Sequence, residues 1–186
     1  MKYAFALLSL FLVACSHPSP KTTVVVIPEK PVDTVKYAIL KFDAVRDSSY
    51  FKKGSRPALL SASEIGKIET IIAKNAIEYN KHEKAFWDSI ERKFHRKEPV
   101  NAIPYDNFIN HPENYYKQFI AVVDTKGQKE VYVNCFRDDY NKESSSDKEY
   151  WRKDIVMVND GGSNYFQVEI NLTTNTIIGF WVNGVA

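Results

Sequence analysis

"QFIAVVDTKGQKEVYVNCF", residues 118–136, predicts a β-hairpin. Two runs rich in β-branched and aromatic residues, 118–124 and 129–136, flank the polar stretch "TKGQ", in which Gly127 supplies the permissive turn position. The second run divides into two alternating sets, Val131, Val133 and Cys135 against Tyr132, Asn134 and Phe136. Because successive side chains of a strand point to opposite faces, the two sets should lie on opposite sides of a sheet.

Further strands follow towards the C-terminus. Residues 154–158, "DIVMV", and 164–172, "NYFQVEINL", are separated by "NDGG" and predict a second hairpin. Alternation within 164–172 places Phe166, Val168 and Ile170 on one face and Tyr165, Gln167 and Glu169 on the other. The turn "TTN" then leads into a last predicted strand, 176–184.

A helix is predicted before these strands. Ser61 and Glu64 have the spacing of a capping box. An apolar stripe then recurs every three or four residues, at Ile65, Ile68, Ile72, Ala76 and Tyr79. Upstream of the helix, residues 35–45 alternate as a strand does, and downstream of it the prolines within 99–117 indicate a loop.

Residues 81–98 extend or restart the helix, with Phe86, Ile90 and Phe94 spaced by four. One interpretation is a basic amphipathic helix that contacts lipid head groups or a partner. The other is a solvated helix that covers the sheet. We favour the second, because acidic side chains offset most of the basic ones.

The order of these elements predicts an α+β domain in which an N-terminal helix packs on a four- to five-stranded antiparallel sheet. This arrangement is similar to cystatin-like folds, which serve mostly as binding or inhibitory modules. The similarity is one of fold only.

Composition describes one ordinary domain after a short leader. The 186 residues carry a formal net charge of +2, which falls to +1 without Lys2, the one charge before Cys15. So small a charge excludes an electrostatic case for binding nucleic acid. Residues 37–186 have the length of a single globular domain.

The N-terminus has the parts of a secretory signal. A basic start precedes the uncharged stretch 3–14, which is too short for the roughly 20 residues that a membrane-spanning helix needs. We therefore assign 1–14 as a signal peptide. Residues 15–36 contain prolines 18, 20, 28 and 31 and are predicted to be an extended tether.

Residues 12–15, "LVAC", resemble the lipobox of bacterial lipoproteins. The resemblance implies cleavage before Cys15 and attachment of a diacylglycerol to its thiol, so that the lipid bilayer is a partner. An ordinary apolar cysteine in a leader is the alternative. Ser16 resembles the pattern that enteric bacteria send to the outer membrane, and no acidic run follows Cys15. We expect an outer-membrane protein that faces the periplasm.

The last seventy residues resemble a class of small Gram-negative envelope lipoproteins of unknown function. The matching parts are "YVNCF", Trp151, the stretch "VNDGGSNYFQVEINL" and the terminal "FWVNGVA". The resemblance implies no enzymatic activity.

Two functions remain open. Exposed rings at Tyr132, Tyr165 and Trp181 would suit an envelope protein or glycan partner, although Trp181 could instead cap the core. We favour a tethered, non-catalytic binding domain without a cofactor or metal. The alternative is a small envelope hydrolase or thiol enzyme using Cys135 with a histidine such as His111, although alternation favours a buried, inert Cys135.

Overall fold

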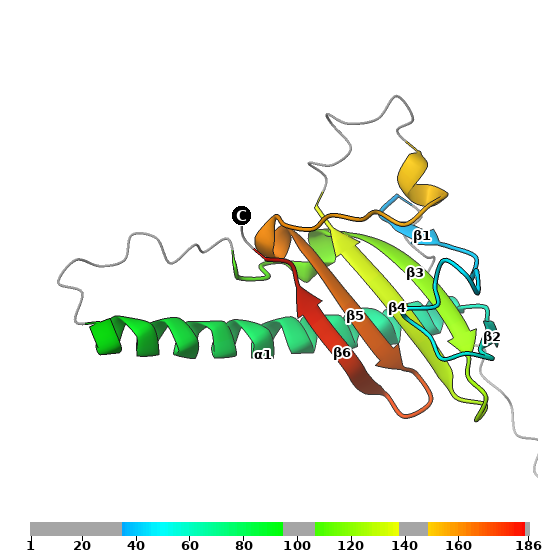
Figure 1. Ribbon diagram of the computed structural model, residues 1–186, viewed down its shortest axis with the longest axis horizontal. Helices are drawn as coiled ribbons and strands as arrows, with labels where there is room; N and C mark the ends of the chain where they lie inside the picture. Colours follow the sequence, from blue (N-terminus) through cyan, green and yellow to red (C-terminus); the bar gives the residue numbers. More distant parts are fainter. Residues whose placement is uncertain (1–34, 95–106, 138–148, 185–186) are drawn as a thin grey trace, which may run out of the picture.

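The computed structural model describes residues 35–94, 107–137 and 149–184. Cys15, the signal peptide, all but the last two residues of the tether and residues 95–98 of the predicted helix extension lie outside these ranges. The described residues form one long α-helix, α1, which lies against one side of a β-sheet, and several short 3₁₀ helices (Figure 1). The bounds are β1 Tyr37–Ile39, β2 Arg56–Pro57, α1 Ala62–Phe94, η2 Pro112–Asn114, β3 Tyr116–Val123, β4 Lys129–Phe136, η3 Tyr150–Arg152, η4 Gly162–Asn164, β5 Tyr165–Asn171 and β6 Thr176–Val182.

The fold is α+β, and its six-stranded sheet is mostly antiparallel. The order is β1-β3-β4-β5-β6, and β2 adds a two-residue pairing to β3. The prediction of four to five antiparallel strands differs from the structure in two ways. The sheet has a further strand, β2, and β1 pairs with β3 in parallel. Parallel pairing needs a long connection. The chain between β1 and β3 supplies one, because it includes the whole of α1.

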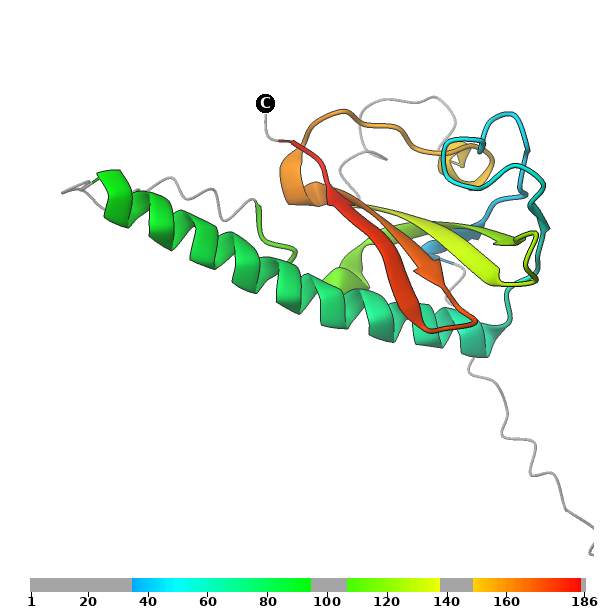
Figure 2. The ribbon, with the colours of Figure 1, turned by 60° about the horizontal axis from the view of Figure 1, so that its bottom comes forward.

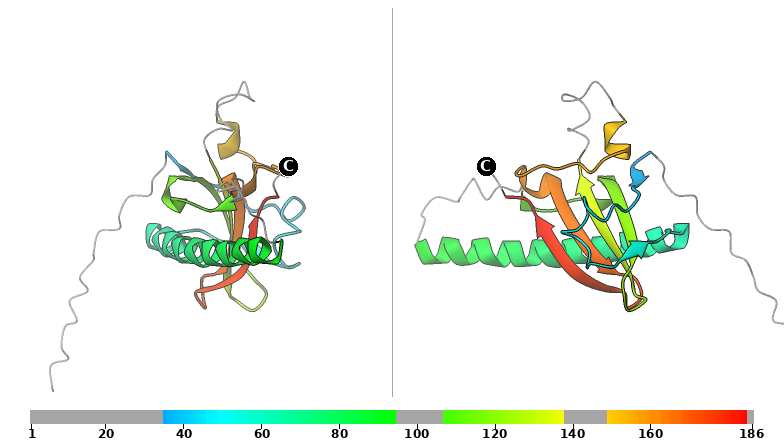
Figure 3. Two further views of the ribbon diagram at one scale, coloured as in Figure 1. Left: turned by 90° about the vertical axis from the view of Figure 1, so that its left-hand side faces the viewer. Right: turned by 45° about the vertical axis from the view of Figure 1, so that its right-hand side comes forward.

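Helix α1 begins as predicted. The Ser61 backbone N–H donates to Glu64 Oε2 at 2.8 Å, and the Glu64 N–H donates to Ser61 Oγ at 3.2 Å. These reciprocal bonds satisfy two backbone donors at the start of the helix. The apolar stripe lies in a buried cluster shared with the sheet, to which Ile65, Ile68, Ile72 and Ala76 contribute, with Tyr79 packed at its border. Figures 2 and 3 show α1 along one face of the sheet, called the inner face here.

The second half of α1 projects past the sheet instead of covering it as expected (Figure 1). Its surface is mixed in charge and largely exposed, with Lys84 paired to Asp88 at 2.9 Å. The Phe86 side chain is 55% exposed. No helix within the three described ranges is both long enough and apolar enough to span a bilayer.

The outer face of the sheet carries a second core. Segments 40–51 and 149–158 lie on this side (Figure 2). Their buried side chains Leu40, Phe51, Trp151, Ile155 and Val156 pack with strand residues Ile120, Val122, Tyr132 and Phe136. Both faces of β3 and β4 are therefore covered, which explains why nearly every residue of these strands is buried.

Residues 154–158 were predicted to form a hairpin with β5, and this prediction is wrong. The segment is not a strand, and β5 pairs with β4 and β6. Side-chain amides hold it instead: Gln118 Oε1 accepts from the Val156 N–H at 2.9 Å, and Asn134 Nδ2 donates to the Val156 carbonyl at 2.8 Å. Its apolar residues are buried against the outer face without a backbone ladder.

Candidate functional site: a pocket on the outer face

The outer face has a pocket with a volume of about 250 Å³ near the open edge of the sheet. It is lined by Ser49, Tyr50, Tyr132, Gln167, Glu169 and Trp181. Two of the three aromatic residues predicted to bind a partner, Tyr132 and Trp181, therefore meet in one place. The third, Tyr165, packs at the border of the outer core and does not line the pocket.

Strand register explains how the pocket floor is built. Tyr132 of β4 is paired with Glu169 of β5, which is paired with Gly179 of β6. In the adjacent row Gln167 of β5 is paired with Trp181 of β6. Paired residues on one face stand directly opposite each other, so these side chains project side by side.

The indole of Trp181 lies over Gly179. A Cβ placed on Gly179 would lie 1.9 Å from Trp181 Cη2 and 2.4 Å from Cζ2, which is far closer than carbon atoms can approach. The absence of a side chain at 179 thus creates the space for the ring. Trp181 remains 49% exposed, whereas its neighbour Phe180 packs against the inner core. The indole therefore forms one open wall of the pocket.

Gly179→Ala should displace the Trp181 indole while leaving the fold intact. The new methyl group occupies the position of the ring, and Trp181 has solvent into which it can turn. We expect a clear shift of the Trp181 indole N–H resonance in a proton–nitrogen NMR spectrum, with an unchanged circular dichroism spectrum. Gly66→Ala is the control, because a Cβ there meets no atom within 4 Å. An unmoved Trp181 resonance in the Gly179 variant would contradict this placement of the ring.

Tyr50 covers Tyr132 and makes the opposite wall. Their ring centroids are 3.9 Å apart with planes inclined by 23°. Tyr132 is consequently only 5% exposed, which corrects the prediction of an exposed ring at this position. Burial raises the pKa of the Tyr132 hydroxyl well above its ordinary range. Tyr50 and Ser49 were not identified from the sequence, because they belong to an irregular segment with no periodic pattern.

Two carboxylates occupy the floor and its margin. Glu169 lines the pocket, and Glu130 lies on the same face of β4, buried to 7% exposure. Burial, and secondarily the Glu130 carboxylate, raises the pKa of Glu169 above its ordinary value. In the part of the chain that the structure describes, neither carboxylate has a hydrogen bond or an ion pair. The site therefore holds negative charge without an internal partner.

A ladder of side-chain amides crosses the outer face beside the pocket. Asn134 Nδ2 donates to Gln118 Oε1 at 2.9 Å, and Gln167 Nε2 lies 3.5 Å from Asn134 Oδ1 and 3.2 Å from Asn183 Oδ1. Asn183 Nδ2 donates in turn to the Val158 carbonyl at 2.6 Å. This ladder joins five segments of the chain and fixes Gln167 at the edge of the pocket.

The two residues of the alternative thiol site lie in different environments. Cys135 is fully buried on the inner face, where burial raises the pKa of its thiol. His111 is at the surface, with Nδ1 3.1 Å from Glu113 Oε1. No hydrogen bond joins His111 to Cys135 within residues 107–137. The buried position of Cys135 agrees with the alternation seen in the sequence.

We expect Cys135 to resist thiol reagents in the folded protein. In a Cys15→Ser full-length variant Cys135 is the sole thiol, so one reagent reports on it alone. A maleimide should react with it only after urea is added, because both burial and the raised pKa suppress the thiolate. Rapid labelling without denaturant would contradict the packing described here and would favour the thiol-enzyme alternative.

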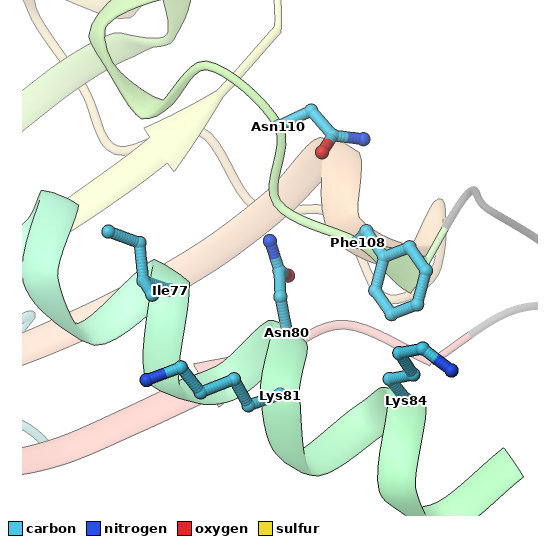
Figure 4. Close-up of a pocket in the computed structure, with 6 residues that line it drawn as sticks. All are labelled: Ile77, Asn80, Lys81, Lys84, Phe108 and Asn110. Atoms are coloured by element: carbon cyan, nitrogen blue, oxygen red, sulfur yellow. The ribbon is translucent and has the colours of Figure 1, made fainter. Parts of the chain in front are cut away.

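A second pocket lies between α1 and the segment before η2 (Figure 4). Its lining is Ile77, Asn80, Lys81, Lys84, Phe108 and Asn110. Asn80 holds the segment in place, since its amide exchanges two hydrogen bonds, of 2.9 and 3.0 Å, with the backbone of Ile109. Lys81 and Lys84 are paired with Glu78 and Asp88 of the same helix. The cations at this pocket are thus already neutralised, and we take the outer-face pocket as the candidate site.

No group of three or more metal-ligating side chains occurs among residues 35–94, 107–137 and 149–184. Comparisons of the chain with protein-family models, curated proteins and solved structures found no match. Function is therefore inferred from the geometry of the outer face.

Proposed function

We propose that this chain is a lipid-anchored envelope lipoprotein whose domain binds another envelope component without catalysis. The observation that carries the proposal is the outer-face pocket, in which Trp181 is held open to solvent over Gly179 and faces a stacked pair of tyrosines. Aromatic rings that are half exposed and rigidly placed are typical of binding surfaces.

The anchor rests on the sequence alone. Cys15 would carry the diacylglycerol, residues 15–36 would hold the domain away from the bilayer, and the protein would sit in the outer membrane facing the periplasm. Two acyl chains bind a membrane stably where a single chain does not. Such an anchor would concentrate the domain near its partner, so the pocket itself need not bind tightly.

A cystatin-like arrangement is part of the proposal. A helix that lies along one face of a mostly antiparallel sheet supports it, and the parallel pairing of β1 with β3 departs from it. The likeness favours a binding module over an enzyme by analogy of fold only. The proposed membership of a class of small Gram-negative lipoproteins adds no activity.

Site-specific photocrosslinking in intact cells tests the proposal. A benzophenone amino acid at Ser49, on the rim of the pocket, should capture one specific envelope component. The matched control is the same group at Val45, which lies in the same segment, is 86% exposed and does not line the pocket. We expect the Ser49 product to disappear in Trp181→Ala and to weaken in Cys15→Ser. Identical products from both positions, or a product insensitive to Trp181→Ala, would overturn the proposal.

A further inference from the structure

We infer that the outer-face pocket binds an organic cation, namely the guanidinium or ammonium group of an arginine or lysine side chain on the partner. This inference rests on the proposed function and names the chemistry that the pocket would recognise. Three features of the described residues carry it: the aromatic walls, the unpaired negative charge and the fixed amide beside them.

The aromatic walls surround a carboxylate. Glu169 stands between Tyr132 on one strand and Gly179 on the other, and the Trp181 ring covers Gly179. Tyr50 closes the side above Tyr132. The faces of such rings attract guanidinium and ammonium cations, and proteins use aromatic cages to bind quaternary ammonium groups.

The negative charge lacks a partner. Burial and the nearby Glu130 carboxylate raise the pKa of Glu169, and no salt bridge joins either carboxylate to a cation among the described residues. A carboxylate that is desolvated without a counterion is unfavourable. An entering guanidinium or ammonium group would neutralise it and form charge-assisted hydrogen bonds, which are stronger than neutral ones.

The same charges discriminate against other ligands. An anionic ligand would be repelled by both carboxylates. A neutral sugar could stack on Trp181 but would leave the negative charge of Glu169 uncompensated. Gln167, whose amide nitrogen is engaged in the ladder, offers its carbonyl oxygen as an acceptor to a ligand at the rim. A planar guanidinium, which can both stack and form paired hydrogen bonds, meets all these groups best.

NMR titration of the full lipidated chain in a non-ionic detergent tests the inference. The probes are Nα-acetyl-arginine amide and Nα-acetyl-lysine amide, with the neutral isosteres Nα-acetyl-citrulline amide and Nα-acetyl-norleucine amide as controls. The readout is the Trp181 indole N–H resonance, assigned with Trp181→Phe. We expect each cation to bind at least about tenfold more tightly than its isostere.

Glu169→Gln should weaken the binding of the arginine probe by about tenfold, because it removes the charge while keeping the shape. Glu78→Gln, on an exposed carboxylate of α1, is the matched control and should change nothing. The Glu169 variant should also be at least as resistant to urea as the parent. A carboxyl group whose pKa is raised by folding destabilises the folded state when ionised, so its removal at neutral pH relieves that cost.

The outcomes separate this inference from the proposed function. Equal affinities for the arginine and citrulline probes, or an unchanged affinity in Glu169→Gln, would refute the inference that the pocket selects a cation. Either result would still be compatible with a binding pocket. Binding of methyl glucoside in preference to the cationic probes would assign the pocket to a glycan. If no probe moves the Trp181 resonance and the Ser49 crosslink is also insensitive to Trp181→Ala, the proposed function itself fails.

Discussion

Leucine in place of Gln118 should destabilise the fold by about 3 kcal/mol, since three buried polar groups and the part-buried Asp154 carbonyl would each lose a partner, although Asn134 Nδ2 keeps its bond to the Val156 carbonyl. The Gln118 amide is fully buried and fully bonded. Its nitrogen donates to the carbonyls of Trp151 and Asp154, and its oxygen accepts from Asn134 Nδ2 and the Val156 N–H. Leucine fills a similar volume and replaces none of these bonds.

Urea denaturation followed by tryptophan fluorescence measures this loss, and hydrogen exchange at the Val156 amide locates it. Gln167→Leu is the control, because Gln167 belongs to the same amide ladder but is only partly buried and makes longer contacts of 3.2 and 3.5 Å. We expect about 1 kcal/mol for that variant. Equal losses in the two variants would show that Gln118 does not hold the 149–158 segment in the way described.

Methionine in place of Lys117 should cost about 3 kcal/mol, the lower end of the range for removing one member of a buried ion pair, because Lys117 is fully buried while Glu69 is 24% exposed. The side chain of Lys117 points to the inner face of the sheet, opposite to that of the next residue, Gln118. Its ammonium group is fully buried, 3.2 Å from Glu69 Oε2 and 2.8 Å from the Pro112 carbonyl. Methionine keeps most of the length of the side chain but removes the cation from Glu69, while the Pro112 carbonyl retains only the Tyr115 N–H at 3.4 Å.

Replacing both partners, as Lys117→Met with Glu69→Leu, should recover much of the loss, since a buried pair can be exchanged for apolar groups at little cost. Lys129→Met is the matched control. Lys129 also joins the sheet to α1, through Glu64 at only 2.6 Å, but both side chains are about a quarter exposed. We expect about 1 kcal/mol there. If Lys129→Met lowered the free energy of unfolding more than Lys117→Met, burial of the ion pair would not be what determines its contribution to stability.

Local patterns in the sequence predicted local structure accurately. The capping box at Ser61 and Glu64 was correct to the residue because both bonds lie within one turn. The hairpin of β3 and β4 was also correct, because Gly127 takes up the positive φ of 79° that its turn requires. The alternation in β5 and the burial of Cys135 followed from the two-residue period of a strand.

The sequence-based predictions were wrong or incomplete where contacts between distant segments determine the structure. Residues 154–158 have the apolar character of a strand, and nothing nearby in the sequence shows that Gln118 and Asn134 take up their backbone groups. The parallel pairing of β1 depends on a connection that includes the whole of α1. In the candidate site, Trp181 and Tyr132 were predicted as binding residues. Tyr50 was not, because it lies in an irregular segment whose position no periodic pattern in the sequence indicates.

The position of β1 has a mechanical consequence for an anchored domain. Under the proposed anchoring, any pull on the lipid reaches the fold first at Val35 and β1. There the Leu40 N–H donates to the Phe119 carbonyl, the Lys117 N–H donates to the Lys36 carbonyl, and Arg152 holds the carbonyls of Val35 and Tyr37. The two backbone bonds pass the load into β3, and the Arg152 bonds pass it into η3, on the opposite side of the sheet from β6. Tension on the tether would therefore be carried by β1 and β3 at one side of the sheet and would leave the indole wall of the pocket, on β6, unstrained.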